Sequence, residues 1–232
     1  MNRVRVVEPL SGRVLSLQVG RTGSVPWRGN QVATAIVKTP VEGPVALGPT
    51  GFAGDEQADL RVHGGPDKAV CCYASEHVPG WAALMGHDLP PGAFGENLTL
   101  AGLTEDRVHI GDTYTLGASV VQVSQPRGPC FKPAARWGRR TLTKEMAQGL
   151  RAGFYLRVLA PGVVAAGDAM TLTDRVSPIT VAEVLRVTYR DRRDPPALAA
   201  VMAVPELASQ WRDSLTALAQ LNRLPVTDPL DD

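Results

Sequence analysis

Residues 119–132 read SVVQVSQPRGPCFK, a valine-rich run that prolines and a glycine end abruptly. β-Branched side chains favour an extended backbone, so we predict a strand over Ser119–Ser124. The two prolines and the glycine cannot continue either a strand or a helix, and they predict a rigid loop. Cys130 is therefore expected on a rigid loop that directly follows a strand, at the rim of the fold.

Short apolar runs separated by Gly, Pro or Asp extend over most of the chain. They predict strands at Arg3–Val7, Arg13–Val19, Ala33–Lys38, Ala69–Tyr73, Asn97–Leu100, Ser119–Ser124, Phe154–Leu159 and Ala169–Thr173. So many short strands favour a barrel or a sandwich, because closing a sheet removes its exposed edges. Helices are expected over Ser75–Met85 and, as one or two segments, between Lys132 and Gln148.

Helical patterns replace strand patterns in the last quarter of the chain. Thr180 and Glu183 form a capping box ahead of a run with helical spacing. Asp194-Pro195 supplies an N-cap and a first-turn proline, and Pro205 is interpreted in the same way for a third helix. The predicted organisation is a mainly β domain over residues 1–174 and a small three-helix domain over residues 175–232.

Composition excludes several classes of protein. The 232 residues include 44% hydrophobic residues, enough for a sizeable core, and the net charge is only +1. Because charges of both signs are mixed along the chain, neither nucleic acid nor a membrane surface is an expected partner. The first twenty residues contain no uninterrupted apolar run of the kind a signal peptide needs, and a cytoplasmic location is predicted.

Cys130 is the strongest candidate for chemistry. Its neighbours Arg127, Lys132 and Arg136 would favour the thiolate, which is a nucleophile or a ligand for a soft metal. The alternative is a small buried hydrophobe, as most free cysteines are. Cys71 and Cys72 are adjacent in the apolar run AVCCY, where they should face opposite sides of a strand and have structural roles.

Two further segments carry candidate binding residues. In DLRVHGGPDK, paired glycines let the backbone approach a ligand, and Arg61 and Lys68 flank a place where amides could hold a phosphate. His63 in this segment is either a ligand-contacting residue or a turn histidine satisfied by the backbone. In GAFGENL, Glu96 and Asn97 could orient a heterocycle through hydrogen bonds, or could be ordinary turn residues.

Taken in order, GDEQADLRVHGGPDKAV, YASEHVPGW, GAFGENLTLAGL, VHIGD, QVSQPRGPCFK and GFYLRVL resemble the MOSC family, named for the C-terminal domain of molybdenum cofactor sulfurase, and within it the YiiM-like branch. The resemblance implies a β-barrel and a C-terminal helical domain. It also implies that the thiolate of Cys130 ligates the molybdenum of a pterin-dithiolene cofactor. The other residues that it places around this cofactor are Arg127, Lys132, His63, Lys68, Asn97, Arg61 and Glu96.

The function implied by the resemblance is the reduction of N-hydroxylated compounds such as hydroxylaminopurine bases, with His63 or a water held by Glu96 as proton source. No flavin or haem motif accompanies it, so a separate reductase is expected to supply electrons. The alternative is a cofactor carrier, or a sulfur-transfer module in which Cys130 carries a persulfide. A homodimer is left open. Val78 and the Cys71-Cys72 pair depart from the side chains expected in this branch, which bears on purine specificity.

Overall fold

The computed structural model describes residues 10–60 and 62–222. Its strands are β1 Ser11–Val19, β2 Gly23–Trp27, β3 Asn30–Thr34, β4 Thr39–Pro40, β5 Val45–Gly48, β6 Gly51–Phe52, β7 Val70–Ala74, β8 Leu98–Ala101, β9 Thr113–Leu116, β10 Ser119–Pro126, β11 Phe154–Ala160, β12 Gly162–Val164 and β13 Ala169–Asp174. Its helices are η1 Pro66–Lys68, η2 Ser75–His77, α1 Val78–Met85, α2 Phe131–Trp137, α3 Leu142–Gly149, α4 Val181–Tyr189, α5 Pro195–Met202 and α6 Ser209–Leu221. The predicted strand Arg3–Val7 lies outside the described residues.

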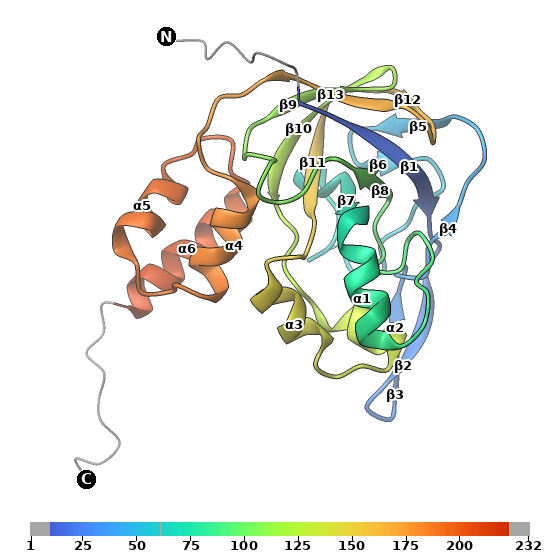
Figure 1. Cartoon of the computed structure of the whole chain (residues 1–232), viewed down its shortest axis with the longest axis horizontal. Helices are drawn as coiled ribbons and strands as arrows, with labels where there is room; N and C mark the ends of the chain where they lie inside the picture. Colours follow the sequence, from blue (N-terminus) through green and yellow to red (C-terminus); the bar gives the residue numbers. More distant parts are fainter. Residues whose placement is uncertain (1–9, 61, 223–232) are drawn as a thin grey trace.

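Seven strands of the described chain close into a barrel, which confirms the mainly β prediction (Figure 1). Their order is β13-β9-β10-β11-β7-β8-β1, and β1 returns to pair with β13. Neighbouring strands run antiparallel except for β7 and β8, which are parallel. Large apolar side chains fill the interior, including Leu17, Leu98, Tyr114 and Phe154, none of them exposed. Closure leaves no sheet edge in this ring to be capped.

The prediction for Ala33–Lys38 is wrong in its bounds. Strand β3 ends at Thr34 and pairs with β2 in a separate hairpin, while the following residues leave the sheet. The hairpin turns at Arg28 and Gly29, which both have positive φ angles of 51° and 81°. A two-residue turn with positive φ at both residues matches the right-handed twist of the flanking strands. The hairpin projects from the barrel beside α2, and the residues after it line the cavity described below (Figure 1).

The C-terminal helices form as predicted except at the start of the third. Thr180 and Glu183 make the reciprocal capping box, and the Asp194 side chain accepts a hydrogen bond from the Ala197 amide. Helix α6, however, begins at Ser209 rather than at Pro205. The chain before it is held along the barrel, because the Ala208 amide donates to the carbonyl of Ser124 at 2.9 Å.

The helical region and the barrel share one hydrophobic core. Leu185, Leu198, Trp211 and Leu215 belong to the same cluster of buried side chains as the barrel interior. The apolar stripe of α6 therefore faces the barrel, and α4, α5 and α6 lie together against one side of it (Figure 1). The domain boundary between residues 174 and 175 stays a prediction. No helix in the described chain is long and apolar enough to cross a membrane.

Candidate functional site

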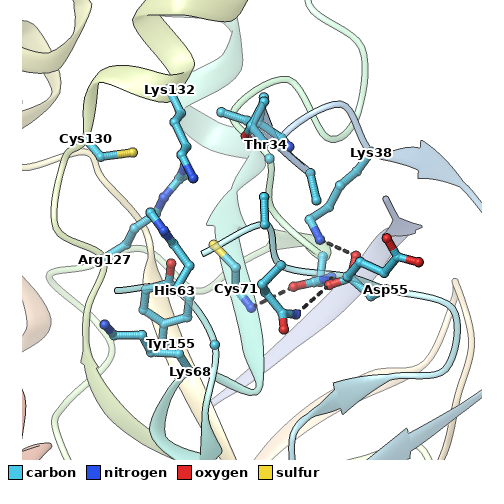
Figure 2. A pocket seen from close by; sticks show the side chains of 18 residues that line it. Thr34, Lys38, Asp55, His63, Lys68, Cys71, Arg127, Cys130, Lys132 and Tyr155 are labelled. Atoms are coloured by element: carbon cyan, nitrogen blue, oxygen red, sulfur yellow. Dashed lines mark hydrogen bonds and ion pairs between the residues drawn. The ribbon is translucent and has the colours of Figure 1, made fainter. Parts of the chain in front are cut away.

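A cavity of about 70 Å³ that is open to solvent lies at the end of the barrel where strand β10 runs into the Cys130 loop. Figure 2 shows the side chains that line it. Among the predicted site residues, the structure places six on its wall: His63, Lys68, Asn97, Arg127, Cys130 and Lys132. These come from three segments that are far apart in sequence. Arg61 lies outside the described residues.

One rung of the barrel forms the floor of the cavity. Cys71 on β7 pairs with Tyr155 on β11, and Tyr155 pairs in turn with Gln125 on β10. On the other side, the Cys71 amide donates to Asn97 Oδ1 at 3.1 Å and the Asn97 amide donates to the Cys71 carbonyl at 2.7 Å. Because strand side chains alternate, Cys71 faces the cavity while Cys72 is fully buried in the barrel core. Cys71 is therefore a cavity residue as well as a structural one.

Tyr155 is a site residue that the sequence analysis missed. It lies between the core residues Phe154 and Leu156, so alternation turns its side chain to the cavity instead. That alternation is visible in the sequence and would have found it. Burial, together with the nearby Cys71 thiol, raises the pKa of Tyr155 well above its usual range. Its hydroxyl therefore stays protonated and can donate a hydrogen bond into the cavity.

Arg127 is buried beneath the Cys130 loop with an unsatisfied donor. Its backbone amide donates to the Gly153 carbonyl at 2.9 Å, and its Nη2 donates to the Phe94 carbonyl at 2.5 Å. Its Nη1 is buried and has no hydrogen-bond partner. An unpaired guanidinium in the interior is costly, and the structure gives it no carboxylate partner among the described residues. The free donor in the cavity wall is therefore suited to an anionic ligand.

His63 is a neutral imidazole at neutral pH. Burial lowers its pKa, and the charges of Lys132, Arg127 and Lys68 lower it further, to about 4, although Asp59 acts in the opposite direction. Its Nδ1 is also buried without a partner. Figure 2 shows the side chains of His63, Arg127 and Lys132 converging beside Cys130. In the chain alone, His63 is therefore a neutral ring that can form hydrogen bonds. Its predicted role as a proton source stays a prediction.

The opposite end of the cavity is a closed network of polar side chains (Figure 2). Asp55 is almost fully buried and forms an ion pair with Lys38, which is also buried. It also accepts from the Gly20 amide at 2.8 Å and from Asn97 Nδ2 at 2.9 Å. Asn97 uses both ends of its amide in such contacts, since Nδ2 also donates to the Gln18 carbonyl. Asn97 therefore shapes the cavity wall by holding neighbouring segments of the chain together.

Glu96 and Arg136 have other partners than those predicted. The Glu96 carboxylate accepts from the Gly92 and Phe94 amides at 2.7 and 3.0 Å, so it organises its own loop and does not line the cavity. The guanidinium of Arg136 donates to the carbonyls of Ile36 and Gly92 and is likewise absent from the wall. Neither residue is brought to Cys130. Their neighbours in sequence, Asn97 and Lys132, are the ones that reach the cavity.

The donor set fits an anionic group that brings most of its own metal ligands. Within the described ranges, no three His, Cys, Asp or Glu side chains come together to hold a bare metal ion. Cys130 offers one soft sulfur, and three cations, Arg127, Lys132 and Lys68, line the same cavity. The unpartnered Nη1 of Arg127 and Nδ1 of His63 leave two hydrogen-bonding positions for such a group.

Comparison with known proteins now places the chain. Residues 59–171 match the MOSC domain model, and residues 179–220 match the model of the YiiM-like 3-alpha helix domain. The chain belongs to the MOSC-domain proteins, a molybdopterin-cofactor-binding family. Within that family it belongs to the YiiM-like branch, since both domains of the branch are present in order.

Three relatives illustrate this membership. The chain is 43% identical over 202 residues to the uncharacterized protein YflK of Bacillus subtilis, covering 87% of this chain and 91% of that one. The crystal structure of YiiM from Geobacillus stearothermophilus is 37% identical, with a TM-score of 0.76 over 89% of this chain and 98% of that one. A protein of Gibberella moniliformis named "Reductase" is 34% identical over 95% of this chain, which spans only 36% of that longer protein.

Proposed function

We propose that this protein is a molybdenum-cofactor-dependent reductase of N-hydroxylated compounds, with hydroxylaminopurine-type bases as the substrate class. One observation carries the proposal: the cavity thiol on the loop after β10, Cys130, lies beside a buried guanidinium, Arg127, whose Nη1 has no partner. A thiolate ligand and an unpaired cation are together what an anionic metal-dithiolene group requires from its protein. Membership of the MOSC family and the fungal relative named "Reductase" support it.

In this proposal, five of the cavity residues would hold the cofactor. Cys130 would bind the metal through sulfur, while Arg127 and Lys132 would neutralise the negative charge of the metal-dithiolene unit or of the pterin phosphate. His63 would offer a hydrogen bond from a neutral ring. Lys68 stands further along the same wall as another cation. When bound, the cofactor supplies the two-electron redox chemistry that no side chain of this chain can provide.

The overall reaction is R–NHOH + 2 e⁻ + 2 H⁺ → R–NH₂ + H₂O, in which the N–O bond breaks and nitrogen is reduced. Both protons must reach the cavity. Tyr155 keeps its hydroxyl proton at neutral pH and can donate a hydrogen bond to a bound substrate. His63 is not an imidazolium at neutral pH while its cationic neighbours are uncompensated, so it keeps only one ring N–H proton. A bound anionic group would offset those charges and raise the pKa of His63 toward its ordinary value.

The two electrons require a donor outside this chain, and we propose a separate reductase protein. The sequence contains no flavin or haem motif. The Gibberella protein named "Reductase" contains a region similar to this chain within a polypeptide almost three times as long.

The test is the molybdenum content of protein purified without oxygen from cells that make the cofactor. We expect near-stoichiometric metal in the native chain and loss of metal in Cys130→Ala. Cys71→Ala is the matched control, because it removes the other thiol from the same cavity and should keep the metal. Reduction of an N-hydroxylated purine with a chemical reductant should follow the metal content. Absence of metal from the native chain, with a persulfide on Cys130 by mass spectrometry, would instead support sulfur transfer.

A further inference from the structure

The helical domain reaches the cavity wall through the first turn of α6. The Nζ of Lys68, a cavity residue, donates to Oε1 of Gln210, the second residue of α6. The same ammonium donates to the Val62 carbonyl at 2.7 Å. These two contacts use two of the three N–H donors of Lys68 and fix where the charge lies. The third donor is left for the cavity.

The same helices also contact the loop that carries Cys130. A Cβ built on Gly128 would lie 3.6 Å from Tyr189 Oη, at the end of α4, and 3.6 Å from the Trp211 ring on α6. A methyl group at Gly128 would therefore just touch both helices, so α4 and α6 lie about one methyl group away from the loop. Since Gly128 separates Arg127 from Pro129 and Cys130, the two helices border the part of the loop that carries the thiol.

A third set of contacts fixes the segment just before α6. Arg157 donates to the Glu206 carbonyl at 2.9 Å and to Oδ1 of Asp67 at 2.8 Å. Asp67 precedes Lys68 in η1, and Ala208 donates to Ser124 at the end of β10. The segment leading into α6 is thus tied both to the turn that carries Lys68 and to the strand that leads to Arg127.

We propose that α6 is a positioning element of the cavity: Gln210 sets the position of the Lys68 ammonium, and the helical domain thereby sets the affinity of the cavity for an anionic group. This inference rests on the proposed function in one respect, that the group bound in the cavity is anionic. It assigns the three-helix domain a part in ligand binding in addition to its packing on the barrel. Lys68 is the cation through which α6 changes the affinity of the cavity for the anionic group.

A substitution that changes the charge of Gln210 but keeps its shape tests this proposal. Gln210→Glu keeps the oxygen acceptor for Lys68 but adds a negative charge beside it, so the contact survives while the cavity loses positive potential. Gln220→Glu is the matched control, because it adds the same charge to an exposed position near the other end of α6, about 15 Å away along the helix. Deleting the domain would be uninformative, since its side chains form part of the barrel core.

The affinity of the cofactor-free chain for inorganic phosphate should fall about five- to tenfold in Gln210→Glu, measured by calorimetry, with no loss of thermal stability. Molybdenum content should fall in the same variant, and Gln220→Glu should match the native chain in both. Equal affinities in the three proteins, an equal loss in both variants, or no phosphate binding by the native chain would overturn the inference. A native chain that binds no molybdenum, with the phosphate difference intact, would overturn the proposed function alone.

Discussion

Protonation of His63 should make this protein lose stability as the pH falls from about 6.5 to about 4. The folded pKa of His63 is about 4, against 6.5 for an ordinary histidine, because burial and three nearby cations disfavour the charged ring. Between pH 6.5 and about pH 4, the unfolded chain therefore binds a proton at His63 that the folded chain does not bind. At ~1.4 kcal/mol per pH unit, the difference between 6.5 and about 4 sets an upper bound of about 3.5 kcal/mol on this loss of stability. Because the ring is partly solvated, we expect about 1–2 kcal/mol.

The assay is urea unfolding at pH 7.5, 6.0, 5.0 and 4.5 with the cofactor-free chain and with His63→Gln, which cannot take up the proton. Carboxylates whose pKa is lowered, such as Glu56 and Glu145, also reduce stability in acid, but they do so equally in both proteins. The difference between the two curves isolates His63. The native chain should lose about 1–2 kcal/mol more than the variant over this range. If the free energy of unfolding depended on pH in the same way in both proteins, the conclusion that His63 is neutral and surrounded by cations would be refuted.

Two further predictions concern the residues that shape the cavity wall. Arg127→Met should remove most of the bound molybdenum. The free energy of unfolding should change by less than about 1 kcal/mol, because the loss of the hydrogen bond to Phe94 is offset by removal of an unpaired buried charge. Full metal content in this variant would exclude Arg127 from the site. Glu96→Ala should destabilise the chain by about 2–4 kcal/mol, because the Gly92 and Phe94 amides lose their buried acceptor. A urea midpoint equal to that of the native chain would show that the Glu96 carboxylate does not stabilise this loop.

Local sequence signals predicted the elements whose causes are local. The strand at residues 119–124 begins where expected but continues to Pro126, because Gln125 and Pro126 still pair with β11, and the loop of Cys130 then ends at α2. The capping box of Thr180 and Glu183 forms as expected. The hairpin of β2 and β3 was not predicted as a pair, because its turn uses Arg28 in a positive-φ conformation instead of the Asn or Gly that signals such turns. The start of α6 was misplaced because residues 205–206 form a turn and the Ala208 amide then donates to the carbonyl of Ser124, which is distant in sequence.

The sequence by itself determined which chemical groups are available: one thiol on a rigid loop, Cys130, flanked by Arg127 and Lys132, within a chain that folds as a β-rich domain followed by three helices. Only the tertiary structure decided which of these groups meet. Barrel closure brings Tyr155 and Cys71 onto one rung beside that loop, and turns Glu96 and Arg136 to other partners. Backbone preferences act over a few residues, whereas burial and charge act through space between segments that the chain itself keeps apart.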